Sequence, residues 1–386
     1  MTLPEVIRDR IGRAGPIPFA DFAALALYHP GLGYYTRAEQ RSGRAGDFYT
    51  SVDLGPLFGR LLARQFAEMW RLLPGSPEGT GPGAFDLVEA AAGNGRLARD
   101  ILDAAARDDP PFYDAIHLHL VEPSEAARAA QPATLGRHAA RLASSGPDLP
   151  PRIRGAVFAN ELLDALPPHV LVMTGGGLRE VYVDTAAGGD RFVERLGPVS
   201  ARARQHVDRH QITLEPGWRA EVTPDAIDWV ARAVASIDEG FLLLIDYGHE
   251  AHELYSATHA AGTLTTFRDH RAGAAGDDGP APWLIDPGAR DITAHVDLTA
   301  VRGAAERAGA ETLGVLDQTY FLLGLGALEA VDDAAATGSV AALRARLALK
   351  TLLVPGGLGS THKVLIFGVE VGRPSVAGCS YRLRAT

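Results

Sequence analysis

The sequence carries, at residues 85–96, the stretch Phe85-Asp86-Leu87-Val88-Glu89-Ala90-Ala91-Ala92-Gly93-Asn94-Gly95-Arg96. Its first five residues form a short apolar run typical of a buried strand, and the periodic pattern from 97 to 106 predicts an amphipathic helix. Glycines between them allow a ligand to lie against the backbone, and the free N–H groups at the helix start face that ligand. We therefore predict a ligand-binding turn between a strand and a helix.

Two kinds of ligand are compatible with this turn. The pattern Gly93-x-Gly95-x-x-Ala98 satisfies the dinucleotide fingerprint, with Glu122 closing the next strand as the acid that binds the ribose. An S-adenosylmethionine site uses the same fold but also needs an acidic residue at the start of the loop, and Glu89 occupies that place. A carboxylate there repels a pyrophosphate and attracts a cationic cofactor. The sequence thus favours S-adenosylmethionine, while a dinucleotide and a turn without ligand stay open.

The composition is that of a globular protein. Of 386 residues, 46% are apolar and 22% are charged, which excludes disorder over the whole chain. The formal net charge of -10 disfavours nucleic acid as a partner, and the single cysteine, Cys379, cannot form an internal disulfide. No apolar run is long enough to cross a bilayer, and no targeting segment is recognised. We expect a cytoplasmic protein without membrane insertion; a homodimer is one possibility.

Around the turn, apolar runs alternate with amphipathic helices, a pattern typical of a parallel sheet wrapped by helices. Further strands are predicted at 116–122, 154–159, 241–246 and 362–371, with a β-rich insertion at 170–192. Helices are predicted at 4–11, 19–27, 57–73, 224–237, 298–308, 320–331 and 340–352. The predicted parts are an N-terminal helical segment (1–83), a Rossmann-like core (84–250) with a β insertion around 170–215, a C-terminal extension (251–372) and a frayed tail (373–386).

Seven separated motifs point to one family. They are Tyr28-His29-Pro30-Gly31-Leu32-Gly33-Tyr34-Tyr35, Gly46-Asp47-Phe48-Tyr49-Thr50-Ser51, Asn160-Glu161-Leu162-Leu163-Asp164-Ala165-Leu166-Pro167, Asp246-Tyr247-Gly248-His249, Gly262-Thr263-Leu264, Asp291-Ile292-Thr293-Ala294-His295-Val296-Asp297 and His362-Lys363-Val364-Leu365. In this order they resemble the MidA and NDUFAF-seven-like group of class I S-adenosylmethionine-dependent methyltransferases, relatives tied to arginine methylation of a respiratory complex I subunit. The resemblance spans residues 28–365.

The resemblance implies a fold, a cofactor and a substrate class. The fold is α/β: a Rossmann-like class I methyltransferase sheet with an N-terminal helical segment over the cofactor, an inserted β-hairpin element and a helical C-terminal extension. The cofactor is S-adenosyl-L-methionine, and the acceptor is a nitrogen, above all an arginine guanidinium in a protein or peptide. The helical C-terminal extension is expected to shape the substrate cleft.

Candidate site residues follow predicted strand ends, where open α/β sheets bind ligands. An arginine substrate stays protonated, and two carboxylates can grip its guanidinium bidentately, so Glu161 and Asp164 are the catalytic candidates. Cofactor-binding candidates are Thr50, Ser51, Glu89, Ala91, Gly93, Gly95, Glu122 and Asn160. Substrate-binding candidates are Asp246, Tyr247, His270 and His295. The histidines form no His-Glu-x-x-His motif, and no metal is predicted.

The chain departs from the family in two places. The family usually has Glu-x-Gly-Pro-Gly-x-Gly in the cofactor loop, whereas this chain has Ala91 and Ala92 in place of the first glycine and the proline. An alanine at 91 is expected to serve in this loop only if its φ is negative and its methyl does not touch the cofactor. The stretch 265–271 is less basic than expected because of Asp269. Three alternatives stay open: a nicotinamide oxidoreductase, a non-catalytic assembly factor, and a methyltransferase for a peptide or small metabolite of a biosynthetic pathway.

Overall fold

The computed structural model describes residues 1–36, 51–75, 83–189, 191–268, 271–273, 281–329, 347, 349–353 and 361–381. The chain forms two compact units, each built from three separate segments. The first, here called the parallel-sheet unit, comprises Tyr49–Leu162, Val230–Tyr247 and Arg302–Thr386. The second, the antiparallel unit, comprises Met1–Phe48, Leu163–Trp229 and Gly248–Val301. The division into consecutive parts expected from the sequence stays a prediction.

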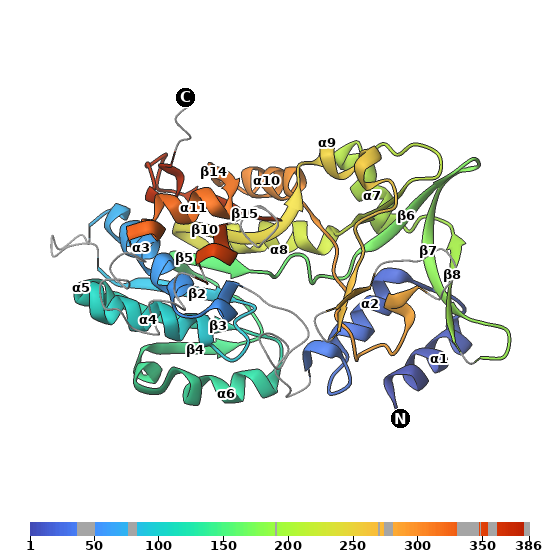
Figure 1. Ribbon diagram of the computed structural model, residues 1–386, viewed down its shortest axis with the longest axis horizontal. Coiled ribbons are helices and arrows are strands. Elements are labelled where there is room, and N and C mark those ends of the chain that lie inside the picture. The colour runs from blue at the N-terminus through green and yellow to red at the C-terminus, as the bar shows by residue number, and fades with distance from the viewer. Residues whose placement is uncertain are drawn as a thin grey trace. The chain divides into compact units, whose positions relative to one another are not determined.

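The parallel-sheet unit is built on one sheet with the strand order β14-β15-β10-β5-β2-β3-β4 (Figure 1). Its strands are β2 (Phe85–Ala90), β3 (Ile116–Val121), β4 (Leu142–Gly146), β5 (Ile153–Asn160), β10 (Ile237–His249), β14 (Glu311–Asp317) and β15 (His362–Val369). Strands β10, β5, β2, β3 and β4 are parallel, and β15 lies antiparallel between β10 and β14. The strand order reverses between β2 and β5, and such a switch point is where open α/β sheets bind ligands.

Helices cover this sheet because their apolar residues recur on one side. The helices are α3 (Leu57–Leu72), α4 (Arg96–Asp108), α5 (Pro110–Ala115), α6 (Glu125–Leu135), α8 (Pro224–Ala235), α10 (Leu298–Arg307) and α11 (Gln318–Gly324), some of which extend beyond the unit. Figure 1 shows α3 beside α4, and both share one apolar core with the sheet. The buried rings of Phe66 on α3 and Phe158 on β5 lie 4.9 Å apart. Burial of these apolar side chains is the main stabilising contribution to the unit.

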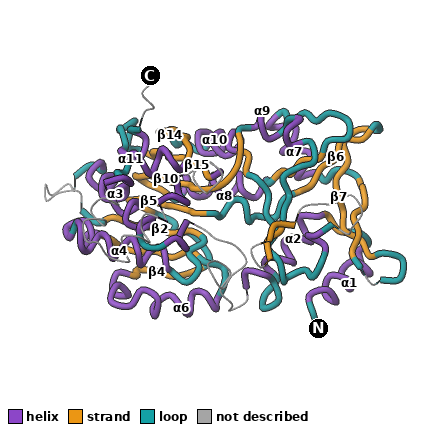
Figure 2. Tube along the Cα trace, viewed as in Figure 1, coloured by secondary structure: helices purple, strands orange, loops and turns teal. Residues whose placement is uncertain are grey.

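The antiparallel unit contains a second, smaller sheet. Its strands are β1 (Ile17–Pro18), β6 (His169–Thr174), β7 (Gly177–Thr185), β8 (Phe192–Gly197) and β9 (Arg219–Val222), in the order β1-β7-β6-β9 with β8 on β7. Its helices include α1 (Leu3–Ala14), α2 (Phe19–Tyr28), α7 (Ala201–His210) and α9 (Ala251–Leu254). On α1 the buried residues Leu3, Ile7 and Ile11 recur every fourth position, and they join a core with the sheet. Figure 2 shows the strands of this sheet in orange.

Short elements complete the two units. The remaining strands are β11 (Thr266–Arg268), β12 (Arg271–Gly273) and β13 (Val296–Asp297). The 3-10 helices are η1 (Tyr34–Thr36), η2 (Ser51–Leu54), η3 (Gly136–Arg141), η4 (Ala257–His259), η5 (Pro282–Leu284) and η6 (Ala377–Cys379). The tail at 373–386 is expected to fray, but η6 within it is hydrogen-bonded to α3: Gly378 donates its backbone N–H to Oε1 of Gln65 at 3.0 Å.

The expected fold class is confirmed. The predicted strands within the sheet all form, the inserted β element is the antiparallel meander β6 to β8, and helices flank the core toward both ends of the chain. The helix predicted at 320–331 begins earlier, at Gln318, and α11 ends at Gly324. Most of the helix predicted at 340–352 lies outside the described residues. The sheet also contains β4 and β14, which the sequence does not predict.

Candidate active site

One edge of the parallel sheet collects most of the predicted site residues. Strands β2, β3, β5 and β10 are parallel neighbours, so their carboxyl ends meet at the same edge. The register aligns Ala90 at the end of β2 with Val121 on one side and Ala159 on the other. Because β15 is antiparallel, it begins at this edge with His362, which is aligned with Tyr247. This edge is the candidate site.

The loop after β2 turns sharply because its residues adopt left-handed backbone conformations. The φ angles are 56° at Ala91, 51° at Gly93 and 82° at Gly95. Glycine adopts such angles freely, whereas alanine loses roughly 1–2 kcal/mol. The expectation of a negative φ at Ala91 is therefore wrong: the turn needs a left-handed residue directly after the strand, and the alanine accepts the strain. Strained backbone of this kind concentrates at binding and catalytic sites.

Glu89 places a buried carboxylate beneath this loop. The residue is 5% exposed, and its Oε2 accepts the backbone N–H of Ala98, in the first turn of α4, at 3.1 Å. Burial raises the pKa of Glu89 well above its usual range, and the nearby carboxylate of Glu122 adds to the rise. An ammonium or sulfonium beside this carboxylate would restore its charged form. The position therefore suits a cation and opposes a pyrophosphate.

Glu122 holds the loop from the next strand. Its Oε2 accepts the N–H of Gly93 at 2.9 Å, and its Oε1 accepts the N–H of Ser124 at 2.8 Å. Each carboxylate oxygen has a second lone pair, so Glu122 can still accept ribose hydroxyls. Gln131 on α6 completes the support: its Nε2 donates to the carbonyl of Gly93 at 2.8 Å, and its Oε1 accepts from Ser145 at 2.6 Å. The sequence does not reveal Gln131, because a glutamine within a helix carries no motif.

Ser51 is fully buried in η2, and its hydroxyl donates to Oε1 of Gln318 at 3.2 Å. The guanidinium of Arg96, the first residue of α4, donates to the carbonyl of Val52 at 2.6 Å. The chain around Ser51 is thus bound to the helix that follows the glycine loop. The other hydroxyl candidate, Thr50, lies outside the described residues.

The end of β5 carries a second strained residue, Glu161, with φ of 54°. Its Oε1 accepts from Nδ2 of Asn160 at 3.1 Å and lies 3.6 Å from Nε2 of His362. Both side chains of this Glu161–His362 pair are sheltered from solvent, with 13% of Glu161 and 4% of His362 exposed. The Oδ1 of Asn160 is buried and has no hydrogen-bond partner among the described residues. A buried acceptor without a donor is typical of a place where a ligand supplies one.

Asp246 joins the ends of the two neighbouring strands β5 and β10. It is 2% exposed, and its carboxylate accepts the backbone N–H of Leu162 at 3.2 Å and that of Tyr247 at 2.9 Å. The ring of Tyr247 packs edge-on against His362, with centroids 5.4 Å apart. These contacts favour a positioning role for Asp246, with Tyr247 packed on His362, which in turn lies beside the carboxylate of Glu161.

Two further predicted residues belong to the antiparallel unit. Asp164 is buried, and its Oδ2 accepts from the hydroxyl of Thr293 at 2.8 Å. Burial and two neighbouring histidines lower the pKa of His295 to about 4. Asp164 and Glu161 thus fall in different units, and a two-carboxylate grip is not a feature of either unit alone. His270 lies outside the described residues.

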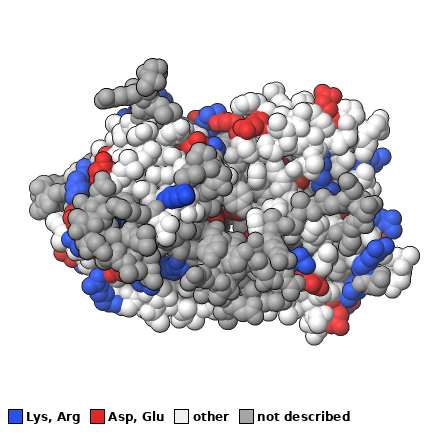
Figure 3. Space-filling model, in the orientation of Figure 1, with Lys and Arg blue, Asp and Glu red and all other residues white. Residues whose placement is uncertain are grey.

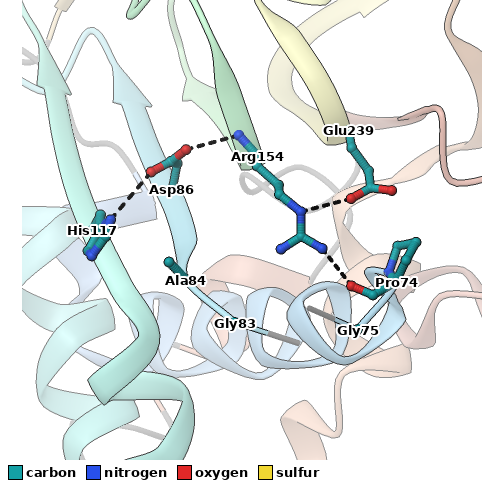
Figure 4. Close-up of a pocket in the computed structure, with 8 residues that line it drawn as sticks. All are labelled: Pro74, Gly75, Gly83, Ala84, Asp86, His117, Arg154 and Glu239. Carbon is teal, nitrogen blue, oxygen red and sulfur yellow. Dashed lines mark hydrogen bonds and ion pairs between the residues drawn. The ribbon is translucent and has the colours of Figure 1, made fainter. Parts of the chain in front are cut away.

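A hollow of about 600 Å³ lies at the opposite edge of the parallel sheet, beside the amino ends of β2, β3, β5 and β10 (Figure 4). It is lined by Pro74, Gly75, Gly83, Ala84, Asp86, His117, Arg154 and Glu239. Arg154 spans it: its Nε donates to Glu239 and its backbone N–H to Asp86, both at 2.9 Å. Because these charges pair with one another and open α/β sheets bind ligands at the other edge, this hollow is not the candidate site.

Comparisons with known proteins identify a family that uses S-adenosyl-L-methionine. Residues 61–316 match the model of a family described as S-adenosyl-L-methionine-dependent methyltransferases. The Mus musculus protein named protein arginine methyltransferase NDUFAF7, mitochondrial, is 31% identical over 345 residues, covering 82% of this chain and 72% of that protein. Its Drosophila melanogaster homolog is 29% identical, covering 83% of this chain and 74% of that protein. A crystal structure of a COG1565 superfamily member from Burkholderia thailandensis bound to S-adenosyl-homocysteine is 31% identical, with a TM-score of 0.85 over 98% of this chain and 94% of that chain.

The same comparisons correct one expectation. The mouse and fly relatives are named mitochondrial, which contradicts the cytoplasmic location expected from the first residues of the sequence. That expectation is wrong, because a short stretch of composition is a poor guide to location.

No helix within the described ranges is both long and apolar enough to span a membrane. On the face shown in Figure 3, basic and acidic side chains lie interspersed.

Proposed function

Because the chain belongs to the S-adenosyl-L-methionine-dependent methyltransferase family, we propose that its acceptor is the guanidinium of an arginine in a protein substrate. The reaction class and the cofactor follow from the family. The acceptor is supported by relatives that are named protein arginine methyltransferases. The observation that carries the proposal is the sheltered carboxylate of Glu161, held by Asn160 at the carboxyl edge of the sheet.

The residues at the carboxyl end of β2 fit S-adenosylmethionine, which supplies an electrophilic methyl carbon when bound. We assign Glu89 to the cationic methionine end, because a buried carboxylate with a raised pKa gains most from a nearby positive charge. Glu122 accepts the ribose hydroxyls while it holds Gly93. The remaining polar groups that we assign to the cofactor are Ser51 and Oδ1 of Asn160, which has no hydrogen-bond partner among the described residues.

Glu161 is assigned to the acceptor. A protonated guanidinium is planar, and a carboxylate can bind two of its N–H groups and aim one nitrogen at the methyl carbon. Transfer forms one C–N bond and breaks one C–S bond, and the attacking nitrogen must lose one proton to keep the product singly charged. In this proposal Glu161 accepts that proton, and its contact with His362, whose Nε2 lies 3.6 Å from its Oε1, supports the role. Asp246 and Tyr247 keep the Glu161–His362 pair in position. We retain Asp164, His270 and His295 as candidates for binding the protein substrate.

Labelling tests this assignment. The purified chain is incubated with methyl-labelled S-adenosylmethionine and proteins of a host lysate, and the acid hydrolysate is examined by mass spectrometry for methylarginine. Glu161→Gln should lower the rate by more than about 100-fold while binding of S-adenosyl-homocysteine is retained, as expected for loss of an acid–base group. The matched control is Glu125→Gln, because that side chain is 93% exposed on α6.

Other outcomes separate the alternatives. Label found only on a small molecule would replace the arginine proposal by the biosynthetic one. Binding of S-adenosyl-homocysteine without any turnover would favour a non-catalytic assembly factor. The homodimer expected from the sequence also stays a proposal, and light scattering that gives the mass of one chain would contradict it.

A further inference from the structure

Three histidines, of which only His295 is among the substrate candidates, lie together in the antiparallel unit. His249 ends β10, His259 ends η4, and His295 directly precedes β13. One ring nitrogen from each lies within 4.8 Å of those of the other two. The ring centroids of His249 lie 4.6 Å from His259 and 5.1 Å from His295. Parallel pairing of β10 with β13 aligns Gly248 with Val296, so the backbone itself holds two of the rings near each other.

Contacts at Nδ1 of two of these rings favour Nε2 as the metal-binding nitrogen. Nδ1 of His249 lies 3.2 Å from a carboxylate oxygen of Glu253, and Nδ1 of His259 lies 2.9 Å from the carbonyl of the same residue. A carboxylate or carbonyl on one ring nitrogen fixes the tautomer and leaves Nε2 as the ligand, which is the usual support of a metal-binding histidine. The backbone of His295 is held by the hydroxyl of Thr263 at 3.1 Å.

We propose that His249, His259 and His295 bind one divalent transition metal of the zinc class through three imidazole nitrogens, with water in the fourth position. Imidazole suits Zn²⁺ and its neighbours, whereas Mg²⁺ and Ca²⁺ need oxygen ligands. Tetrahedral Zn–N bonds of about 2.05 Å separate the nitrogens by about 3.3 Å, so ring rotations that close the widest pair by about 1.5 Å complete the site.

The site would link three chain segments of the antiparallel unit. The ligands are separated by 10 residues (259 − 249) and by 36 residues (295 − 259). Such spacing matches no metal-binding motif, which explains why the sequence predicts no metal. Binding at these ligands stabilises the native unit by mass action, because the unfolded chain does not hold the three rings together.

Metal titration tests the proposal independently of methyl transfer. Untagged protein is stripped with a chelator and titrated with Zn²⁺ by calorimetry and with Co²⁺ by visible absorption. We expect one equivalent of each, a four-coordinate Co²⁺ spectrum and a raised unfolding temperature. His259→Ala should weaken binding by more than about 100-fold, and Glu253→Gln by about 10–100-fold as a ligand support. The matched control is His252→Ala, an exposed histidine of the same segment.

Circular dichroism of each metal-free variant separates lost ligands from lost folding. Absence of stoichiometric binding to the wild-type chain would overturn the proposal. So would equal affinity in wild type and His259→Ala, or an equal loss in His252→Ala. Because Glu253→Gln leaves all three ligands in place, an intermediate affinity in that variant is a result that a merely structural histidine cluster would not produce.

Discussion

Replacing Ala91 by glycine should stabilise the protein, although it removes a methyl group. Ala91 has φ of 56°, and release of an L-residue from that conformation is worth roughly 1–2 kcal/mol. Glycine adds unfolded-state entropy, which costs about 0.4–1 kcal/mol. The half-buried methyl loses roughly 0.4 kcal/mol, half the value of a buried CH₂. The net expectation for Ala91→Gly is a gain of about 0.5 kcal/mol in the free energy of unfolding.

The neighbouring Ala92 provides the matched control. It is 6% exposed and is not among the residues with positive φ, so Ala92→Gly loses the methyl and the entropy without any relief of strain. We expect a loss of roughly 1–2 kcal/mol. Equilibrium urea unfolding followed by circular dichroism measures both variants. The opposite signs are the test: if Ala91→Gly is destabilised as much as Ala92→Gly, the left-handed strain assigned to Ala91 is absent.

Three more outcomes follow from buried groups. S-adenosyl-homocysteine carries an ammonium, so its binding should lower the raised pKa of Glu89 and release a proton; calorimetry in buffers of different ionisation enthalpy measures the release, and its persistence in Glu89→Gln would contradict the assignment. Burial lowers the pKa of His206 from 6.5 to about 3, so the unfolded chain binds more protons in that window and stability falls as pH falls through it; His206→Gln should flatten the pH dependence of the urea midpoint, and an unchanged slope would refute this. Phe158→Ala should cost about 3–5 kcal/mol because the ring is fully buried, whereas Leu328→Ala, at a side chain 53% exposed, should stay within about 0.5 kcal/mol.

The sequence predicts the centre of the parallel sheet better than its edges. Strands β2, β3, β5 and β10 lie inside the sheet, and most of their apolar residues are buried, as in the run Phe241–Ile245 of β10. The two strands that the sequence does not predict, β4 and β14, are the first and last in the strand order. Half-exposed edge strands carry polar residues, as Ser144 and Ser145 do on β4, and β14 is interrupted by a register shift before Gly314. Their pattern is therefore weaker than that of a buried strand.

Local chemistry is predicted from sequence where one residue suffices, and is missed where partners come from distant segments. Glu89 and Glu122 are found because Glu89 is the second-last residue of β2, before the glycine loop, and Glu122 directly follows β3. Gln131, which holds that loop from α6, is missed because its role depends on a contact with Gly93 across 38 residues. The histidine cluster is missed for the same reason. The sign of φ at Ala91 cannot be deduced from the residue type alone, since the ends of the neighbouring strands determine it.

The two strained residues of the candidate site share one physical cause. After β2, Ala92 donates its N–H to the carbonyl of Val121, the last residue of β3, at 3.1 Å. After β5, Glu161 donates its N–H to the carbonyl of Ile245 on β10 at 2.8 Å. The segment after each strand is thus bonded to the neighbouring strand where it must leave the sheet, and a residue in the left-handed conformation permits the turn. The strain, roughly 1–2 kcal/mol at each residue, is maintained by the sheet, and it fixes the glycine loop and the carboxylate of Glu161 at the ends of two adjacent strands. Relaxing either turn should therefore affect ligand binding or turnover more than it affects the fold.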